Sequence, residues 1–220
     1  MADDQQAPDM DLLRARYENV HIEYVKQPES IPEPEGNLDQ HAGWFRSVSV
    51  QSILKQFWAL QRGWEFFQEK HSLLKPGSII PVKSLKDAPT DEFPLIVRCR
   101  PDLWCQNIRL PMNLFLGSDC CHTPWWSTFG GVNDRMAIMG AQAAEHYFKV
   151  FFKREKLWAY GCPLHPETML RASLEDGGVT IIPKWLAEFR ICRLPDKDHP
   201  SPYIVPEQIW PHDQATLILG

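Results

Sequence analysis

A short apolar strand that ends in charged residues constrains the fold of this chain more than any other segment. The segment PLIVRCRPDLW spans residues 94–104, and its residues 95–97 form the kind of apolar run that is buried on both faces in α/β proteins. Side chains two positions apart share one face of a strand, so Arg98 and Arg100 point the same way and Asp102 follows where the strand ends. Ligands of open α/β sheets bind just beyond the carboxyl ends of strands. The segment therefore predicts either a polar site or an internal Arg–Asp salt bridge that closes the strand.

The spacing of apolar residues elsewhere alternates between the periods of helices and strands. Residues 48–70 repeat large apolar side chains at three- and four-residue steps, which predicts an amphipathic helix of several turns. Further helices are expected at 142–152 and from Pro166 to a stop at Gly177, and further strands at 20–25, 135–139, 179–185 and 187–194. This order predicts the α/β class, with a mostly parallel sheet flanked by helices.

The domain organisation follows from length and local composition. The chain has 220 residues, enough for one domain with a sizeable core. Residues 1–11 are acidic and polar and are expected to be a disordered tail. Residues 12–195 are expected to form a single α/β domain, and the proline-rich segment 196–220 to pack on its surface as a tail.

Charge and hydropathy exclude several classes of protein. The net charge is -5, so no electrostatic footprint for nucleic acid is visible. No apolar run approaches the roughly 20 residues that a transmembrane helix needs. The start, MADDQQAPDMD, lacks the basic and apolar regions of a signal peptide. The expectation is a soluble cytoplasmic protein without a membrane span.

The six cysteines contain no C-x-x-C pair. Cys120, Cys121 and His122 are adjacent, which suggests a metal, but neighbouring cysteines rarely chelate one ion and no second ligand pair has zinc spacing. Reduced, mostly buried thiols are the preferred interpretation.

The segment FGGVNDRMAIMG, residues 129–140, is a second candidate site. Gly130 and Gly131 permit a loop that passes close to a ligand. Asn133, Asp134 and Arg135 then place an amide, a carboxylate and a guanidinium side by side, a set that can bind a hydroxyl-rich ligand or act as a base. The alternative is a Gly-Gly turn in which Asn133 and Asp134 cap their own backbone and Arg135 pairs with Asp134.

The segment PLHPE, residues 163–167, is a third. His165 and Glu167 could provide an acid, a base or a metal ligand. The alternative is that Glu167 only stabilises the first turn of a helix, where a negative charge is favourable by a few tenths of a kcal/mol.

Together and in this order, RCRPDL, FGGVNDRMAIMG and PLHPETML resemble motifs of the small GT-A-type glycosyltransferase-like proteins of microbial, algal and viral surface-polysaccharide systems. The resemblance runs from about residue 48 to residue 193. It implies a GT-A-like, Rossmann-like domain. It also implies transfer of a sugar from a nucleotide-sugar donor to a hydroxyl of a carbohydrate or glycoprotein.

The resemblance also implies roles for individual residues. Asp102 would hold a divalent Mg²⁺ or Mn²⁺ and the donor diphosphate, assisted by phosphate binding to Arg98 and Arg100. Asp134 or Glu167 would be the catalytic base. The residues expected to contact the sugar or the acceptor are Gly130, Gly131, Asn133, Arg135 and His165.

Two features depart from that family. The usual acidic motif is Asp-any-Asp, whereas Arg100, Pro101 and Asp102 supply one acid, which puts metal dependence in question. The first strand–helix unit of the family has no counterpart, because the residues before the match contain one plausible strand, at 20–25. The sheet is therefore expected to be incomplete at its N-terminal side.

An incomplete sheet leaves backbone groups unpaired, which costs free energy. A truncated chain, a protein partner that completes the sheet, and a non-catalytic protein derived from the same scaffold all remain open. The last would be an interaction or carbohydrate-binding module that uses tryptophan-rich loops such as PWW at 124–126.

Overall fold

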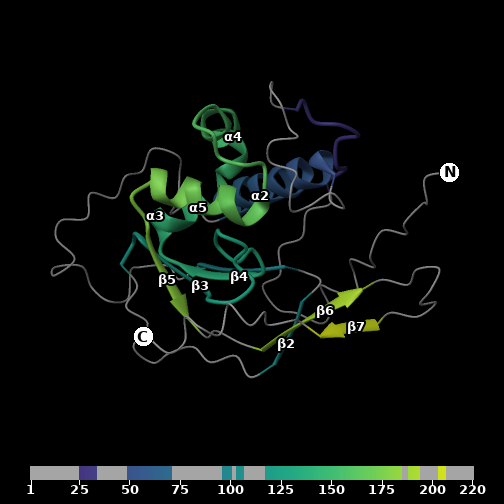
Figure 1. Ribbon diagram of the computed structural model, residues 1–220, viewed down its shortest axis with the longest axis vertical. Helices are drawn as coiled ribbons and strands as arrows, with labels where there is room; N and C mark the ends of the chain where they lie inside the picture. The colour runs from purple at the N-terminus through teal and green to yellow at the C-terminus, as the bar shows by residue number, and fades with distance from the viewer. Residues whose placement is uncertain are drawn as a thin grey trace.

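A computed structural model describes residues 25–33, 49–70, 96–100, 103–106, 117–184, 188–193 and 203–206 (Figure 1). The tail predicted at 1–11, residues 20–24 of the strand predicted at 20–25, and Asp102 lie outside these residues, and Val25 is not in a strand. The elements are α2 (Val50–Lys70), β1 (Ile96–Cys99), β2 (Leu103–Gln106), β3 (Cys120–Pro124), β4 (Met136–Met139), α3 (Ala141–Phe148), α4 (Val150–Ala159), α5 (Pro166–Asp176), β5 (Thr180–Lys184), β6 (Glu188–Arg193) and β7 (Tyr203–Pro206). The predicted α/β class is confirmed.

The main sheet has the strand order β1-β4-β3-β5. β4 pairs antiparallel with both β1 and β3, whereas β3 and β5 pair in parallel. Two parallel neighbouring strands need a long crossover connection between them. The chain from β3 to β5 provides one, because it passes through β4, α3, α4 and α5. The prediction of a mostly parallel sheet is wrong for the described strands, because β4 runs antiparallel to both of its neighbours.

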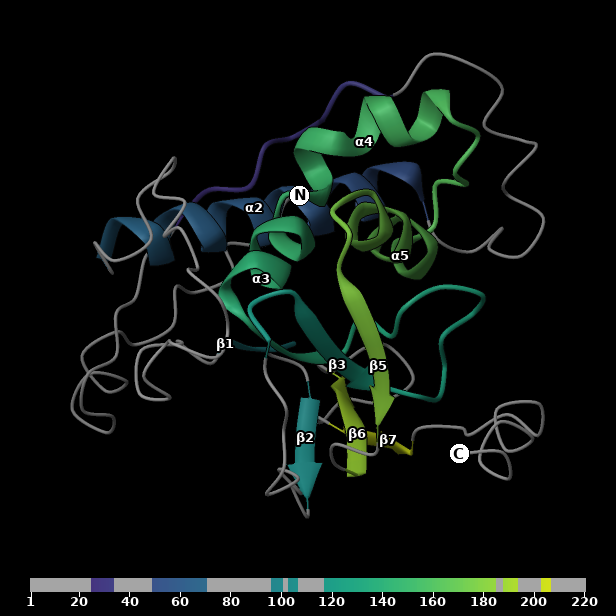
Figure 2. The ribbon, with the colours of Figure 1, turned by 90° about the vertical axis from the view of Figure 1, so that its left-hand side faces the viewer.

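A second sheet is antiparallel and has the order β2-β6-β7. Both ribbon views draw it away from the helices, below the main sheet (Figures 1 and 2). Its last strand, β7, belongs to the segment 196–220, so part of the predicted tail forms a strand. The predicted domain boundary at residue 195 stays a prediction.

The core lies between the main sheet and the helices that cover one of its faces (Figure 2). α2 confirms the helix predicted at 48–70, and Phe57 and Trp64 on its inner stripe are buried. The Trp64 ring stacks on Phe67 and Phe148, at centroid distances of 5.4 and 5.0 Å. Among the described residues, no helix is both long enough and apolar enough to span a bilayer.

Local differences from the predicted elements have local causes. The helix expected at 142–152 is divided into α3 and α4 at Lys149, whose ψ of 12° departs from helical geometry. The strand β3 was not expected. All its residues are buried, which fits a strand between two neighbours in the sheet. Cys121 and His122 belong to this strand, and burial raises the pKa of the Cys121 thiol.

Candidate functional site

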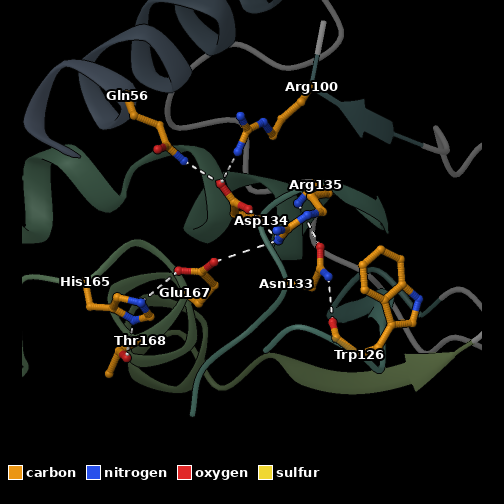
Figure 3. A network of polar contacts seen from close by, with 9 residues as sticks. All are labelled: Gln56, Arg100, Trp126, Asn133, Asp134, Arg135, His165, Glu167 and Thr168. Carbon is orange, nitrogen blue, oxygen red and sulfur yellow. Dashed lines mark hydrogen bonds and ion pairs between the residues drawn. The ribbon is translucent and has the colours of Figure 1, made fainter. Parts of the chain in front are cut away.

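Three segments that are far apart in the sequence meet in one network of polar contacts (Figure 3). Arg100 follows β1, the loop that contains Asp134 and Arg135 precedes β4, and Glu167 lies in the first turn of α5. Ion pairs connect Arg100 to Asp134, Asp134 to Arg135, and Arg135 to Glu167. The structure therefore brings together at least one polar residue from each of the three predicted motifs, while Arg98 is not part of these ion pairs and Asp102 lies outside the described residues.

The loop and helix α5 approach each other closely because Gly131 has no side chain. A Cβ atom at this position would lie 2.0 Å from the carbonyl carbon of Glu167 and 2.4 Å from the backbone nitrogen of Thr168. The next residue, Val132, donates its backbone N–H to the carbonyl oxygen of Glu167 at 2.9 Å. Gly131 thus has a packing role, while Gly130 is exposed with a φ of 81°.

The carboxylate of Asp134 is held by three side chains. Gln56 Nε2 donates to Oδ2 at 2.7 Å, Arg100 Nη1 lies 3.3 Å from the same oxygen, and Arg135 Nη1 lies 3.5 Å from Oδ1. Only 4% of the Asp134 side chain is exposed. Sequence analysis missed Gln56, although a polar residue one position before the buried Phe57 of an amphipathic helix was a usable signal.

Glu167 has a less complete set of partners. Its Oε1 lies 3.9 Å from Arg135 Nη1, and its Oε2 lies 3.2 Å from His165 Nε2. Burial raises the pKa of Glu167 to about 8, and the nearby charge of Asp134 adds to the rise. The guanidinium groups of Arg135 and Arg100 oppose it. A carboxyl group whose pKa lies near neutral pH can take up and release a proton during a reaction.

His165 immediately precedes α5 and takes an extended backbone conformation. Its Nδ1 lies 2.9 Å from the hydroxyl oxygen of Thr168, so the imidazole contacts one side chain at each nitrogen. Burial lowers the pKa of His165, which keeps the ring neutral at pH 7. Thr168 was not predicted, and its position three residues after His165 at a helix start was the only signal.

The side chain of Asn133 forms hydrogen bonds with the backbone of its own loop, which is the structural alternative to ligand binding. Its Nδ2 donates to the carbonyl oxygen of Trp126 at 2.6 Å, and its Oδ1 accepts the backbone N–H of Arg135 at 2.9 Å. Asn133 is fully buried, and the Arg135 guanidinium lies 5.8 Å from the centre of the Trp126 ring. These contacts give both polar atoms of the Asn133 amide a hydrogen-bond partner within the protein, so no ligand is needed to account for this residue.

Backbone strain is concentrated in the loop before Asn133. Ser127 and Phe129 have φ values of 49° and 46°, which are unfavourable for residues other than glycine. The Phe129 ring meets the His165 ring edge-on, with 6.3 Å between the centroids. Strained backbone of this kind occurs mainly at functional sites, where the surrounding structure holds it in place.

Arg98 lies on the same face of β1 as Ile96, which belongs to the hydrophobic core. Arg98 is 9% exposed, and within the described residues its Nη1 atom and the Tyr147 hydroxyl are buried without a hydrogen-bond partner. Burial raises the pKa of Tyr147, and the charge of Arg98 opposes the rise, so the two groups are within electrostatic reach. An orphaned buried donor of this kind needs an explanation, such as a water molecule or a ligand oxygen.

The described residues do not form a metal centre. No group of three or more His, Cys, Asp or Glu side chains within them could hold an ion, and Asp134 is already paired with arginines. The zinc interpretation of Cys120, Cys121 and His122 therefore gains no support from this part of the chain. Asp102 lies outside it, so its role as a metal ligand stays a prediction.

Comparisons with protein-family models, with curated proteins and with solved structures each find no match to this chain. The functional argument therefore rests on the residues of the site and their geometry.

Proposed function

We propose that this chain is a glycosyltransferase-type domain with a GT-A-like fold, and that the Asp134–Arg135–Glu167 network is its acid–base centre. It would transfer a sugar from a nucleotide-sugar donor to a hydroxyl of a carbohydrate or glycoprotein. The observation that carries the proposal is the position of Glu167: a buried carboxyl beside Asp134, with a pKa raised to about 8. Such a carboxyl is protonated in most molecules at pH 7 and becomes a base for a hydroxyl proton as the pH rises through about 8.

The arginines support a donor that carries phosphate. Guanidinium groups bind phosphate oxygens well, and the side chain of Arg100 is 27% exposed beside the two carboxylates. Arg98 adds a buried Nη1 donor that has no partner within the described residues, and a phosphate oxygen would satisfy it. A divalent ion at Asp102 would neutralise charge on the leaving diphosphate.

A non-catalytic interaction module is the second candidate, and one observation favours it. Asp134 is 4% exposed on its side chain and is fully engaged by Gln56, Arg100 and Arg135. A network closed in this way can be purely structural. The module would bind a carbohydrate or a protein partner, with the half-buried Trp125 at its surface.

The test is thermal unfolding with UDP-, GDP- and dTDP-sugars, with Mn²⁺ or with a chelator, followed by a transfer assay on the donor that binds. A donor present at about 100 times its Kd adds roughly 2.7 kcal/mol to the free energy of unfolding. Glu167→Gln should leave that shift intact and lower the transfer rate by about 10²- to 10⁴-fold, because the base is lost.

Glu175→Gln is the matched control, since Glu175 lies on the same helix and its side chain is 54% exposed in a pair with Arg171. It should leave both the shift and the rate unchanged. Absence of a shift with any donor, in a folded sample, contradicts the transferase proposal. A shift without transfer by the unsubstituted protein supports the binding module.

A further inference from the structure

Arg98 places a positive charge in the protein interior without a partner among the described residues. The side chain is 9% exposed, and its Nη1 atom is enclosed with no hydrogen-bond acceptor. The ion pairs of the polar network involve Arg100 and Arg135 instead. A guanidinium cannot lose its proton in a protein, so burial of Arg98 stays unfavourable until an acceptor reaches it.

Two more guanidinium groups lie beside Arg98 at the same end of the main sheet. Arg98 pairs with Ala137 in the β1–β4 ladder. The ladder continues beyond β1, because the backbone N–H of Arg100 donates to the carbonyl oxygen of Arg135 at 3.0 Å. Opposite residues of an antiparallel pair share a face, as do residues two apart in one strand. The three arginines are therefore neighbours on the face that carries Ala137, a residue of the core.

The carboxylates of the network do not balance these three guanidinium groups. Asp134 contacts Arg100 and Arg135. Glu167 lies 3.9 Å from Arg135, and burial raises its pKa to about 8, so it is mostly protonated at pH 7. Three guanidinium groups against two carboxylates leave a positive charge even when both carboxylates are ionised. A phosphate group carries about two negative charges at neutral pH, and guanidinium groups bind its oxygens well.

The hydroxyl of Tyr147 is a second enclosed group that needs a partner. Tyr147 lies on α3 and is fully buried, and its hydroxyl has no hydrogen bond within the described part of the chain. It belongs to the same core cluster as Ile96 and Ala137, which are the neighbours of Arg98 along β1 and across the ladder. Burial raises the pKa of Tyr147, and Arg98 is the charged group that affects this pKa most. A phenol that keeps its proton can donate to an anion.

We propose that Arg98 and Tyr147 form an oxyanion site, in which the guanidinium and the phenolic hydroxyl donate to one phosphate oxygen. The charges of Arg100 and Arg135 favour the same anion. This inference deepens the proposed function and rests on it for the source of the phosphate, the diphosphate of the nucleotide-sugar donor. Free phosphate or pyrophosphate has the same chemistry and is the other source. Tyr147 then joins the site from a helix that contains none of the three sequence motifs.

The alternative is a purely structural pair, in which a small movement lets the Tyr147 hydroxyl accept a hydrogen bond from Arg98. The two explanations differ in the protein without a ligand. A structural hydrogen bond stabilises the fold, so its loss in Tyr147→Phe lowers the unfolding temperature. A hydroxyl that serves a ligand has no partner until the ligand binds, so its removal leaves the unfolding temperature unchanged or raises it.

The test is isothermal titration calorimetry with pyrophosphate, inorganic phosphate, UDP, GDP and dTDP, each at constant ionic strength and with a chelator present. The chelator ensures that the protein alone holds the anion. Tyr147→Phe keeps the ring in the core and should weaken pyrophosphate binding about 10-fold, the worth of one hydrogen bond to a charged group. Arg98→Met removes the charge and should weaken it about 100-fold. Without an anion, neither variant should unfold at a lower temperature than the unsubstituted protein.

Tyr160→Phe and Arg171→Met are the matched controls. Tyr160 is 78% exposed, and the side chain of Arg171 is 51% exposed in its pair with Glu175. Neither control should change the affinity for pyrophosphate. If Arg171→Met weakens binding as much as Arg98→Met does, the anion binds to surface charge and the inference is wrong.

The remaining outcomes separate the site from the function. Absence of binding by every one of these anions to the folded, unsubstituted protein overturns the inference, and so does a lower unfolding temperature of ligand-free Tyr147→Phe. Tighter binding of one nucleoside diphosphate than of pyrophosphate supports the site and identifies the donor as the source, whereas equal binding supports a site for the free anion.

Failure of the transferase proposal is recognised separately. Pyrophosphate binding that depends on Tyr147, in a protein that binds no nucleotide sugar, supports the oxyanion site and contradicts the transferase. Nucleotide-sugar binding that neither Tyr147→Phe nor Arg98→Met weakens overturns the oxyanion site and leaves the transferase proposal intact.

Discussion

Two acidic residues at opposite ends of helix α5 behave in opposite ways. Glu167 lies in the first turn, and its pKa is raised to about 8, chiefly by burial. Asp176 is the last residue, and its pKa is lowered to about 2, chiefly by hydrogen bonds from Lys156 and then Lys153 of α4. The helix dipole alone favours the charged form at the first turn and disfavours it at the last.

Both residues therefore oppose the trend that the helix itself sets. The dipole contributes about 0.3–1 kcal/mol near an exposed helix end. Loss of water around Glu167 outweighs that effect, because desolvation of a buried carboxyl raises its pKa by several units. At Asp176, direct contact with the ammonium groups of Lys153 and Lys156 also outweighs the dipole, but it lowers the pKa of the carboxyl. The comparison shows that tertiary contacts, more than position in the helix, determine the charge of these groups.

The largest expected effect is a pH dependence of stability that comes from Glu167. The folded state holds the proton more tightly than the unfolded state, so stability is highest below the unfolded pKa and decreases as the pH rises through about 8. The loss should be on the order of 3 kcal/mol between pH 5 and pH 9. Urea unfolding at a series of pH values measures it.

Glu167→Gln should remove most of this dependence and be the more stable protein at pH 9. The control is Glu175→Gln, whose pH profile should follow that of the unsubstituted protein. A decrease in stability that persists in Glu167→Gln would assign the raised pKa to another group.

The second effect concerns the close packing that buries Glu167. Gly131→Ala should destabilise the fold by about 2–3 kcal/mol, because the new methyl group overlaps the backbone of Glu167 and Thr168. The displaced turn should also admit water and lower the pKa of Glu167. The difference between the pKa values of Glu167 and Asp176 would then be smaller. Thermal unfolding and pH titration measure both changes.

Gly130→Ala is the matched control, since no atom lies within 4 Å of a Cβ at that position. Its φ of 81° makes alanine strained there, at a cost of roughly 1 kcal/mol. If Gly131→Ala and Gly130→Ala lost the same free energy of unfolding, the need for glycine at both positions would come from backbone conformation and not from packing on α5.

The smallest effect is expected at the other end of the helix. Asp176→Asn removes the partner of Lys153 and Lys156 and should cost less than about 1 kcal/mol, because the Asp176 side chain is partly exposed. The contribution is present above the unfolded pKa and is lost as the pH falls towards 2. Unfolding at low and high salt measures it, and a loss that salt does not reduce would contradict an electrostatic origin.

Local patterns in the sequence predicted those parts of the fold that depend on neighbouring residues. The stripe of α2, the apolar run of β1, and the proline and glycines that bound α5 each identified an element. β3 has the sequence CCHTP, which carries no strand periodicity, and it is a strand because it is buried between two others. The direction of each strand depends on connections and partners, so the mostly parallel sheet was not correctly predicted.

The sequence by itself determined the α/β class, the three polar motifs and the glycine that one of them requires. Only the tertiary structure decided which polar groups meet, since Gln56 and Asp134 are 78 residues apart and still form a hydrogen bond. It also decided that Glu167 is buried and Asp176 is paired, and hence the direction of each pKa change. The physical reason is that the free energy of a charge depends on the water and the charges around it, and folding alone fixes both.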